Sequence, residues 1–415
     1  MGTRRAALRL LDAVLRQGLP IEAALAGATG GLDRADDRAF ARALAAEALR
    51  RLPDLDALID SATQRRLPPD AKARSVLRLA LVQALVLGTP GHAAIATVLP
   101  LVDGGPRRLV HGVFGALMRK GATLPGLPAL PAAVARRWRK AWGAAAVEAA
   151  RAAIAAPPPL DISLRDPADT DAWAGRLGGA SLVPGHVRLA RGAHVPDLPG
   201  FGEGAWWVQD LSASLPARLL GPGGGRSVLD LCAAPGGKTL QLAAAGWRVT
   251  ALDASAGRLA RLHDNLARTG LRAEVIEGDA ARFTGAGAYD AVLLDAPCSA
   301  TGIFRRHPDV LHRAHDRAIA ALAGQQTAML AHAAGLVAPG GALVYAVCSL
   351  EPAEGEAIAD AFAADRRFAR DPVRAGELPA GIAPGGAGRV RVLPGMLADA
   401  GGADGFFVAR FTRIA

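Results

Sequence analysis

Apolar residues recur at helical spacing through the first 120 residues of the chain. Leu8, Leu11 and Leu15 form one such stripe, and residues 76–85 are apolar on most faces, which is typical of a central helix in a bundle. Residues 121–131 then combine Gly and Pro at a density that no helix tolerates, so we expect a linker there. The pattern predicts an all-α domain over residues 1–125.

The pattern becomes mixed over residues 126–215. Trp138 and Trp142 lie four residues apart in a basic stretch, where they either face a helix core or stack on nucleic-acid bases; core packing is the better-supported interpretation. Short strand-like pieces and turns follow over residues 160–204. We expect a helical linker and a small α+β RNA-binding platform here, followed by a catalytic domain over residues 216–415.

From Ser227 onward, short apolar runs alternate with helical stretches. The first run ends at Ala234-Pro235-Gly236-Gly237, and a helix is expected from Lys238. Such a strand-to-helix crossover is the first unit of a doubly wound, Rossmann-like α/β sheet. Further strands are predicted over residues 248–253, 273–276, 292–294 and 341–347.

The loop after the first strand is typical of a nucleotide site, because glycine lets the backbone approach a ligand beside a helix amino terminus. A P-loop would need glycine where the chain has Cys232, and the Gly-x-Gly-x-x-Gly dinucleotide fingerprint is absent. S-adenosylmethionine is the remaining common ligand, and we expect it as the cofactor. Asp253 and Asp279, each at a predicted strand end, would bind its ribose and its adenine.

The basic residues are concentrated in the amino-terminal third of the chain. The formal net charge is +10, and residues 1–140 alone carry +11. This asymmetry suits a polyanion-binding domain attached to a neutral catalytic domain. The candidate phosphate contacts, each of which could equally be a solvated surface charge, are Arg4, Arg5, Arg38, Arg74, Arg107 and Arg108.

The cysteines indicate a specific chemistry. Their low, odd number (Cys232, Cys298 and Cys348) excludes a disulfide framework and a four-cysteine zinc site, and no metal is expected. Cys298 and Cys348 follow two predicted strands that are neighbours in the usual order of this sheet. A thiolate beside a methyl donor suits methylation of a pyrimidine at carbon 5, because its addition to carbon 6 makes carbon 5 nucleophilic. If its environment favours a shared proton, Asp295 could hydrogen-bond the ring nitrogen and stabilise the charge that this addition places on the ring.

Several motifs resemble those of the RNA cytosine-C5 methyltransferase family. They are Asp230 to Thr239, Asp295-Ala-Pro-Cys-Ser-Ala-Thr-Gly302, Arg306-His-Pro-Asp309, Tyr345-Ala-Val-Cys-Ser-Leu-Glu-Pro352 and residues 404–410. Residues 36–40, 74–80 and 110–114 resemble the NusB fold, an all-α RNA-binding bundle. The whole chain is similar to bacterial 16S ribosomal RNA (cytosine-C5) methyltransferases of the RsmB (Sun/Fmu) type, which have a NusB-like N-terminal domain. This resemblance implies a class I S-adenosylmethionine-dependent methyltransferase sheet.

The resemblance also implies roles for individual residues. Cys348 would be the nucleophile, Cys298 would assist release of the product, and Lys238 would lie near the active centre. The implied cofactor pocket consists of Cys232, Ala233, Ala234, Pro235, Gly236, Gly237, Lys238, Asp253, Asp279 and Asp295. Two departures from the family, Val347 for Thr and Ala300 for Gly, put the fine geometry of the site in doubt.

The sequence leaves the substrate partly open. We expect methyl transfer to a cytosine of 16S ribosomal RNA, before or during small-subunit assembly. The alternatives are the same chemistry on transfer RNA, and a non-catalytic RNA-binding factor in ribosome assembly. A signal peptide is not expected, because Arg9, Asp12 and Arg16 interrupt the amino-terminal apolar stretch. A membrane span is not expected either, because the most apolar run, after Arg78, stops at Gly88-Thr89-Pro90, short of the roughly 20 residues that a membrane helix needs. We expect a cytoplasmic monomer.

Overall fold

The computed structural model describes residues 2–155, 157–192, 194–285 and 287–414. The chain divides into two compact units, residues 1–157 with 304–315, and residues 158–303 with 316–415. These differ from the expected boundaries in two places. The helical linker belongs to the front unit, and the platform belongs to the catalytic unit. Residues 304–315, which were expected in the catalytic domain, belong to the front unit. The three-part functional division stays a prediction.

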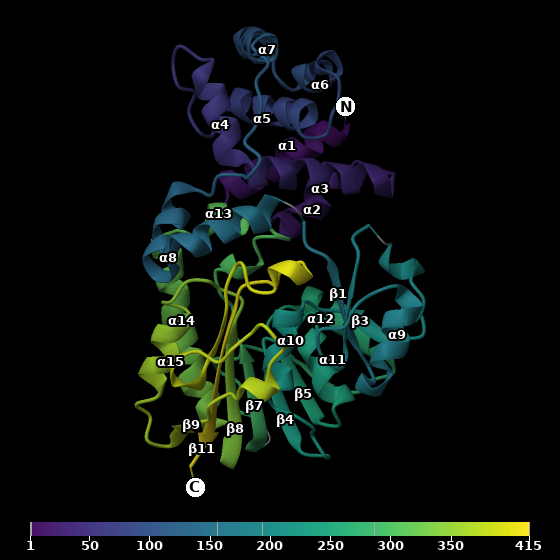
Figure 1. The fold of residues 1–415 in the computed structure, drawn as a ribbon, viewed down its shortest axis with the longest axis vertical. Helices are drawn as coiled ribbons and strands as arrows, with labels where there is room; N and C mark the ends of the chain where they lie inside the picture. Colours follow the sequence, from purple (N-terminus) through teal and green to yellow (C-terminus); the bar gives the residue numbers. More distant parts are fainter. Residues whose placement is uncertain (1, 156, 193, 286, 415) are drawn as a thin grey trace. The chain divides into compact units, whose positions relative to one another are not determined.

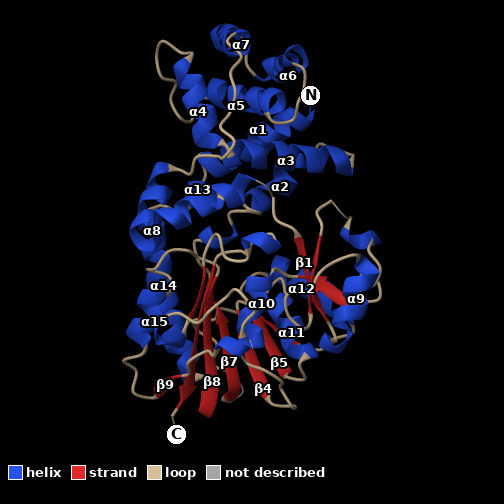
Figure 2. Ribbon diagram, viewed as in Figure 1, coloured by secondary structure: helices blue, strands red, loops and turns tan. Residues whose placement is uncertain are grey.

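The first unit is a bundle of helices joined by loops (Figure 2). Its α-helices are α1 (Gly2–Leu15), α2 (Ile21–Thr29), α3 (Ala35–Arg50), α4 (Leu52–Ser61), α5 (Lys72–Leu85), α6 (Gly91–Val98), α7 (Gly104–Arg119), α8 (Ala132–Ala155) and α13 (Val310–Arg313). Helix α5 is central, because Val76, Leu79 and Val82 are all fully buried. The expected central helix and all-α domain are therefore present.

The segment 304–315, which includes α13, is held in this bundle by specific contacts. Phe304 packs on the buried Trp138 of α8 with ring centroids 5.4 Å apart. A ring nitrogen of His312 lies 2.8 Å from the carbonyl oxygen of Leu49, and Arg50 Nη1 donates to the carbonyl of Arg305 at 3.3 Å. Core packing of Trp138 is thus confirmed, and its partner comes from a segment about 170 residues later in the chain.

Arg74 is a structural residue in this bundle, so its assignment as a phosphate contact is wrong. Only 1% of Arg74 is exposed, and its guanidinium group pairs with Asp56 at 3.2 Å and with Asp60. Arg78, one helical turn later, binds Asp56 at 2.8 Å. A buried charge needs such partners to offset its lost hydration. The residues next to Arg74 in its own helix do not indicate that it is buried, so the sequence did not reveal these ion pairs. Arg5, Arg38, Arg107 and Arg108 are exposed and stay candidates.

The second unit is built on a mixed sheet in the order β10-β11-β8-β7-β4-β5-β6, with β9 paired to β11. The strands are β4 (Ser227–Leu231), β5 (Arg248–Asp253), β6 (Glu274–Glu277), β7 (Tyr289–Asp295), β8 (Val337–Val347), β9 (Phe368–Arg370), β10 (Val390–Val392) and β11 (Phe406–Arg413). The run from β6 to β8 is parallel, and β11 is antiparallel to β8. The chain reverses its direction of winding between β4 and β7, which places a topological switch point there.

Helices cover both faces of this sheet (Figure 1). On one face lie α14 (Asp316–Gly335) and α15 (Glu356–Phe362); on the other lie α10 (Leu211–Arg218), α11 (Gly237–Ala244) and α12 (Ala256–Thr269). Successive strand residues point to opposite faces, so Val228 joins the core beneath α10–α12 and Leu229 the core beneath α14 and α15. Burial on both faces explains the near-continuous apolar runs in the sequence.

A small antiparallel sheet in the order β2-β1-β3 forms the platform beside α10. Its elements are β1 (Leu160–Leu164), α9 (Thr170–Leu177), β2 (His186–Leu189) and β3 (Trp206–Val208). The buried Asp161 accepts from Arg188 at 2.7 Å and from the backbone N–H of Leu211, the first residue of α10, at 3.1 Å. Burial raises the pKa of Asp161, but hydrogen bonds from Arg188 and His186 outweigh it, and the pKa is lowered. This carboxylate fixes the platform to the helix that precedes the catalytic sheet.

Candidate active site

The loop between β4 and α11 turns tightly at the carboxyl edge of the sheet. Gly236 has φ 107°, and a Cβ atom there would lie 2.3 Å from Cδ1 of the fully buried Leu262. Cys232 also adopts a left-handed conformation, with φ 62°. The loop therefore requires glycine at position 236 in order to lie against α12, and this packing brings its backbone to the amino terminus of α11.

We expect Gly236→Ala to damage this loop. The new methyl group would both strain a left-handed residue and overlap Leu262, so a loss of about 1–3 kcal/mol in the free energy of unfolding is expected. Binding of S-adenosylmethionine, measured by calorimetry, should weaken by at least about tenfold. Gly257→Ala in α12, where a Cβ atom meets nothing within 4 Å, is the matched control. Unchanged affinity in folded Gly236→Ala protein would contradict the role of the loop.

The two carboxylates predicted to bind the cofactor differ in environment. Asp253, at the end of β5, is 1% exposed and accepts from the backbone N–H of Ala234 at 3.1 Å and from Arg258 at 2.8 Å. It therefore joins the β4–α11 loop to the next strand. Asp279 follows β6 with a side chain 56% exposed, and accepts from the backbone N–H of Ala281 at 2.9 Å. Asp279 lies at the predicted edge, where its carboxylate pairs with Arg282 at 3.7 Å.

Lys238 and Asp295 form an ion pair at this edge of the sheet. Lys238 is the second residue of α11, Asp295 is the last residue of β7, and their Nζ and Oδ2 atoms are 2.7 Å apart. Burial lowers the pKa of Lys238, but the charge and hydrogen bond of Asp295 outweigh burial and raise the pKa. The ammonium group therefore stays charged. Among the described residues, the carboxylate of Asp295 has no other hydrogen-bond partner, so its second oxygen, Oδ1, is available to a ligand.

Asp230 is a buried carboxylate of β4 that the sequence analysis did not single out. Its Oδ2 accepts from Thr239 Oγ1 at 2.6 Å, and within the described part of the chain its Oδ1 has no partner. Burial raises the pKa of Asp230 to about 7, against the opposing effects of Thr239 and Lys238. The signal in the sequence was an acidic residue in an otherwise apolar strand.

This raised pKa predicts a pH-dependent stability. The unfolded chain loses the Asp230 proton near pH 4 and the folded chain near pH 7, so the carboxyl group makes folding progressively less favourable between these values, by roughly 4 kcal/mol at most. Asp230→Asn removes the titration. Relative to the unmodified protein, we expect its stability in urea unfolding to rise from pH 5 to pH 8. Parallel pH profiles for the two proteins would contradict the assignment.

Cys298 and Cys348 come together as the sequence predicted. Their Sγ atoms lie 3.5 Å apart, one beyond β7 and the other directly after β8, and these strands pair in parallel. The hydrogen bond to Cys348, together with burial, raises the pKa of Cys298 well above its usual value. Burial also raises the pKa of Cys232, to about 12. Both of these side chains therefore keep their protons, and Cys232 is suited to packing rather than to nucleophilic attack.

A cavity of about 400 Å³ lies between the β4–α11 loop and the platform. On the sheet side it is lined by Cys232, Ala233, Ala234, Pro235, Gly237, Lys238, Asp230 and Asp295. On the other side it is lined by platform and helix residues that the sequence analysis assigned no role, including Phe201, Trp207, Gln209, Asp210 and Arg268. Asp253, Asp279, Cys298 and Cys348 lie outside this lining.

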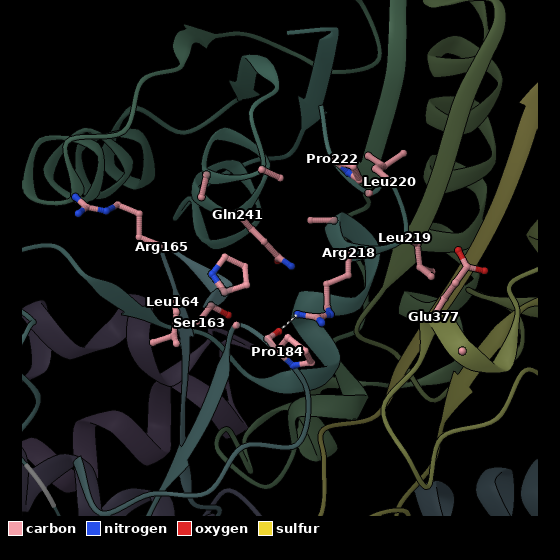
Figure 3. A pocket seen from close by; sticks show the side chains of 17 residues that line it. Ser163, Leu164, Arg165, Pro184, Arg218, Leu219, Leu220, Pro222, Gln241 and Glu377 are labelled. Carbon is pink, nitrogen blue, oxygen red and sulfur yellow. Dashed lines mark hydrogen bonds between the residues drawn. The ribbon is translucent and has the colours of Figure 1, made fainter. Parts of the chain in front are cut away.

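A larger cavity, of about 720 Å³, lies where the platform meets the carboxyl end of α10 (Figure 3). Arg218 Nη1 donates there to the carbonyl of Pro184 at 2.9 Å, and Glu377 is engaged by Arg410 at 2.7 Å. Its described lining includes none of the predicted cofactor or catalytic residues. The smaller cavity, which is lined by the β4–α11 loop, Lys238 and Asp295, is therefore the candidate cofactor site.

Comparison with known proteins decides the family. Residues 217–412 match the family 16S rRNA methyltransferase RsmB/F, and residues 1–114 match the NusB family. The chain is 37% identical over 407 residues to ribosomal RNA small subunit methyltransferase B of Klebsiella pneumoniae, covering 91% of this chain and 90% of the relative. The chain belongs to the RsmB/F methyltransferase family. The resemblance found in the sequence is confirmed.

Two further matches extend over the whole RsmB/F-type chain. Ribosomal RNA small subunit methyltransferase B of Xylella fastidiosa is 37% identical over 429 aligned positions, covering 98% of this chain and 99% of the relative. The solved structure of PH0851 has a TM-score of 0.76 at 22% identity, covering 99% of this chain and 98% of that one. The expected α/β methyltransferase fold with a NusB-like front is therefore confirmed.

S-adenosylmethionine is the cofactor of this methyltransferase, as predicted. The loop fits it on structural grounds. The tight turn at Gly236, which has no room for a Cβ atom, lies at the start of α11. Asp253 places a buried carboxylate at the end of the adjacent strand. Within the described ranges, no group of three or more His, Cys, Asp or Glu side chains could hold a metal ion, and no helix is long and apolar enough to cross a membrane.

Proposed function

We propose that this protein transfers a methyl group from S-adenosylmethionine to carbon 5 of a cytosine in 16S ribosomal RNA, through a temporary bond between Cys348 and carbon 6. The observation that carries the proposal is the 3.5 Å separation of the Cys298 and Cys348 sulfurs, at the edge of the sheet where β7 ends in the Lys238–Asp295 pair. Family membership supports ribosomal RNA as the substrate.

The cofactor pocket is assigned to residues 232–238, Asp253, Asp279 and Asp295. When bound, S-adenosylmethionine supplies an electrophilic methyl group. The loop packing at Gly236 and the hydrogen bond from Ala234 to Asp253 hold the pocket in shape. The Lys238 ammonium group holds one oxygen of Asp295, leaving the other oxygen for the cytosine ring.

In the first step the thiolate of Cys348 bonds to carbon 6, and the electrons of the C5=C6 double bond move into the ring. A proton shared between Asp295 and the ring nitrogen would stabilise this charge. Carbon 5 would then take the methyl group as its bond to the sulfonium sulfur of the cofactor breaks, so that the cofactor leaves as a neutral thioether. A base at the site removes the proton from carbon 5, the C6–S bond breaks, and the double bond re-forms. Cys298 keeps its proton, so its thiol can donate a hydrogen bond to Cys348 Sγ and stabilise the charge that returns to that sulfur.

The test is to incubate the purified protein with methyl-labelled S-adenosylmethionine and either 16S ribosomal RNA or transfer RNA, and to digest the product to nucleosides. We expect the label in 5-methylcytidine from ribosomal RNA. Label only in transfer RNA would shift the substrate class. Label in another nucleoside would overturn the chemistry, and no label with either RNA would favour a non-catalytic assembly factor.

A further inference from the structure

Glu354 is a fully buried carboxylate placed between the two cysteine segments. It lies in the turn between β8 and α15 and has an exposed fraction of 0%. Its Oε1 accepts from the backbone N–H of Ser299 at 2.8 Å and from Gln326 Nε2 at 3.1 Å. Its Oε2 accepts from Ser349 Oγ at 2.5 Å and from Ser299 Oγ. Each of these four donors is an uncharged group.

The donors tie together the residues that follow the two cysteines. Ser299 is covalently joined to Cys298, and Ser349 to Cys348, so one carboxylate holds both neighbours at once. Gln326 of α14 strengthens the arrangement, because its amide also donates to the carbonyl of Pro297 at 2.8 Å. The Tyr345 hydroxyl donates to the backbone carbonyl of Glu354 at 2.5 Å, which fixes Glu354 relative to β8.

The chemistry of these contacts requires an acceptor-only group. An ionised carboxylate offers about four lone-pair sites and no donor, which matches four converging N–H and O–H groups. Burying such a charge is costly unless every one of these sites has a hydrogen-bond partner. An amide would replace one of the two acceptor oxygens by an NH₂ group, and alanine would remove the acceptor that all four donors share. The folded protein thus buries the Glu354 carboxylate, at a cost in solvation free energy, where the two cysteine segments meet.

We propose that Glu354 is a positioning residue that keeps Cys298 and Cys348 at the separation required for the reaction. This inference rests on the proposed function for its catalytic consequence, but the separation itself can be tested without catalysis. Glu354 acts through Ser299 and Ser349 and does not touch the reacting atoms.

The first test measures how strongly the fold favours a bond between the two sulfurs. In a glutathione redox buffer, the protein dithiol and glutathione disulfide exchange to give the Cys298–Cys348 disulfide and two glutathione thiols, so no other oxidant is needed. The equilibrium constant reports the effective concentration of the paired thiols. We expect the constant to fall by at least about tenfold in Glu354→Gln, because loosened segments no longer hold the thiols together. Peptide mass mapping separates this disulfide from any involving Cys232.

The matched control is Glu274→Gln, the same substitution on β6, where the carboxylate accepts from Thr250 Oγ1 at 3.0 Å. Its redox equilibrium should equal that of the unmodified protein. An unchanged equilibrium in folded Glu354→Gln protein would overturn the proposal. Failure of the unmodified protein to form the disulfide would also overturn it, since the premise is a pair of thiols held together.

The second test measures catalysis. In Glu354→Gln we expect kcat for methyl transfer to fall about 100-fold. KM for S-adenosylmethionine should change by less than about threefold, because the cofactor-binding loop follows β4, whereas Glu354 holds the segments that follow β7 and β8. A purely structural role would instead lower thermal stability and leave kcat per folded molecule intact. If the redox equilibrium changes but the unmodified protein methylates no RNA, the proposed function fails and the positioning role stands.

Single hydroxyl deletions keep the proposal testable if Glu354→Gln does not fold. Ser349→Ala and Ser299→Ala each remove one donor and leave the carboxylate with its other partners. We expect each to lower the redox equilibrium constant and kcat by about threefold, and the double variant to lower them further. Unchanged values in both single variants and in the double variant would contradict the proposal.

Discussion

Replacement of Cys348 by alanine is expected to abolish methyl transfer. Without the thiolate, carbon 5 of cytosine stays a weak nucleophile, and a loss of about 10⁴-fold or more in kcat is expected for removal of a covalent nucleophile. The measurement is transfer of labelled methyl groups from S-adenosylmethionine to 16S ribosomal RNA. Because Cys348 is not among the residues assigned to the cofactor pocket, cofactor affinity measured by calorimetry should change by less than about threefold.

That calorimetric measurement is the control for folding of the Cys348→Ala variant. Lost activity together with lost cofactor binding would indicate a damaged fold rather than a missing nucleophile. Retention of a tenth or more of the activity by a variant that binds the cofactor normally would exclude Cys348 as an obligatory nucleophile.

The second large effect is expected for Cys298→Ala, which should accumulate a covalent protein–RNA complex. Cys348 still attacks in this variant, but its sulfur loses the thiol 3.5 Å away that would stabilise it on departure. The complex should survive denaturing electrophoresis and reach near-stoichiometric amounts, whereas the unmodified protein should show little. Both the RNA and S-adenosylmethionine should be required for full accumulation.

The double variant Cys298→Ala/Cys348→Ala is the control, and it should form no complex. A complex that persists in the double variant would come from another residue. Accumulation in Cys348→Ala and none in Cys298→Ala would reverse the roles of the two cysteines.

Most of the catalytic sheet was predictable because its signals are local. Apolar runs identified the parallel strands, and acidic or sulfur side chains directly after them identified the functional edge. In a parallel sheet the carboxyl ends of strands share one edge, so Asp253, Asp295 and Cys348 had to lie along it. The φ of Ala300, 56°, lies where glycine is favoured, which accounts for the glycine that the family commonly has at this position rather than for the alanine of this chain.

Features that depend on contacts between distant segments were not predictable. The burial of Arg74 depends on carboxylates 14 and 18 residues earlier, and nothing in its own helix reveals them. The placement of residues 304–315 in the front unit depends on Trp138, Leu49 and Arg50. Glu354 looks like an ordinary turn residue until Ser299 and Gln326 are brought to it. These residues acquire their roles only when the chain folds.

Trapping the reaction on fluorinated RNA tests the central claim most directly. Fluorine at carbon 5 of the target cytosine cannot leave as a proton does, so the bond between the protein and carbon 6 should persist after methyl transfer. The unmodified protein would be incubated with S-adenosylmethionine and 5-fluorocytidine-containing 16S ribosomal RNA, digested, and mapped by mass spectrometry. We expect the modified nucleotide on the peptide that contains Cys348. Attachment to Cys298, or no covalent attachment with an active protein, would contradict the account.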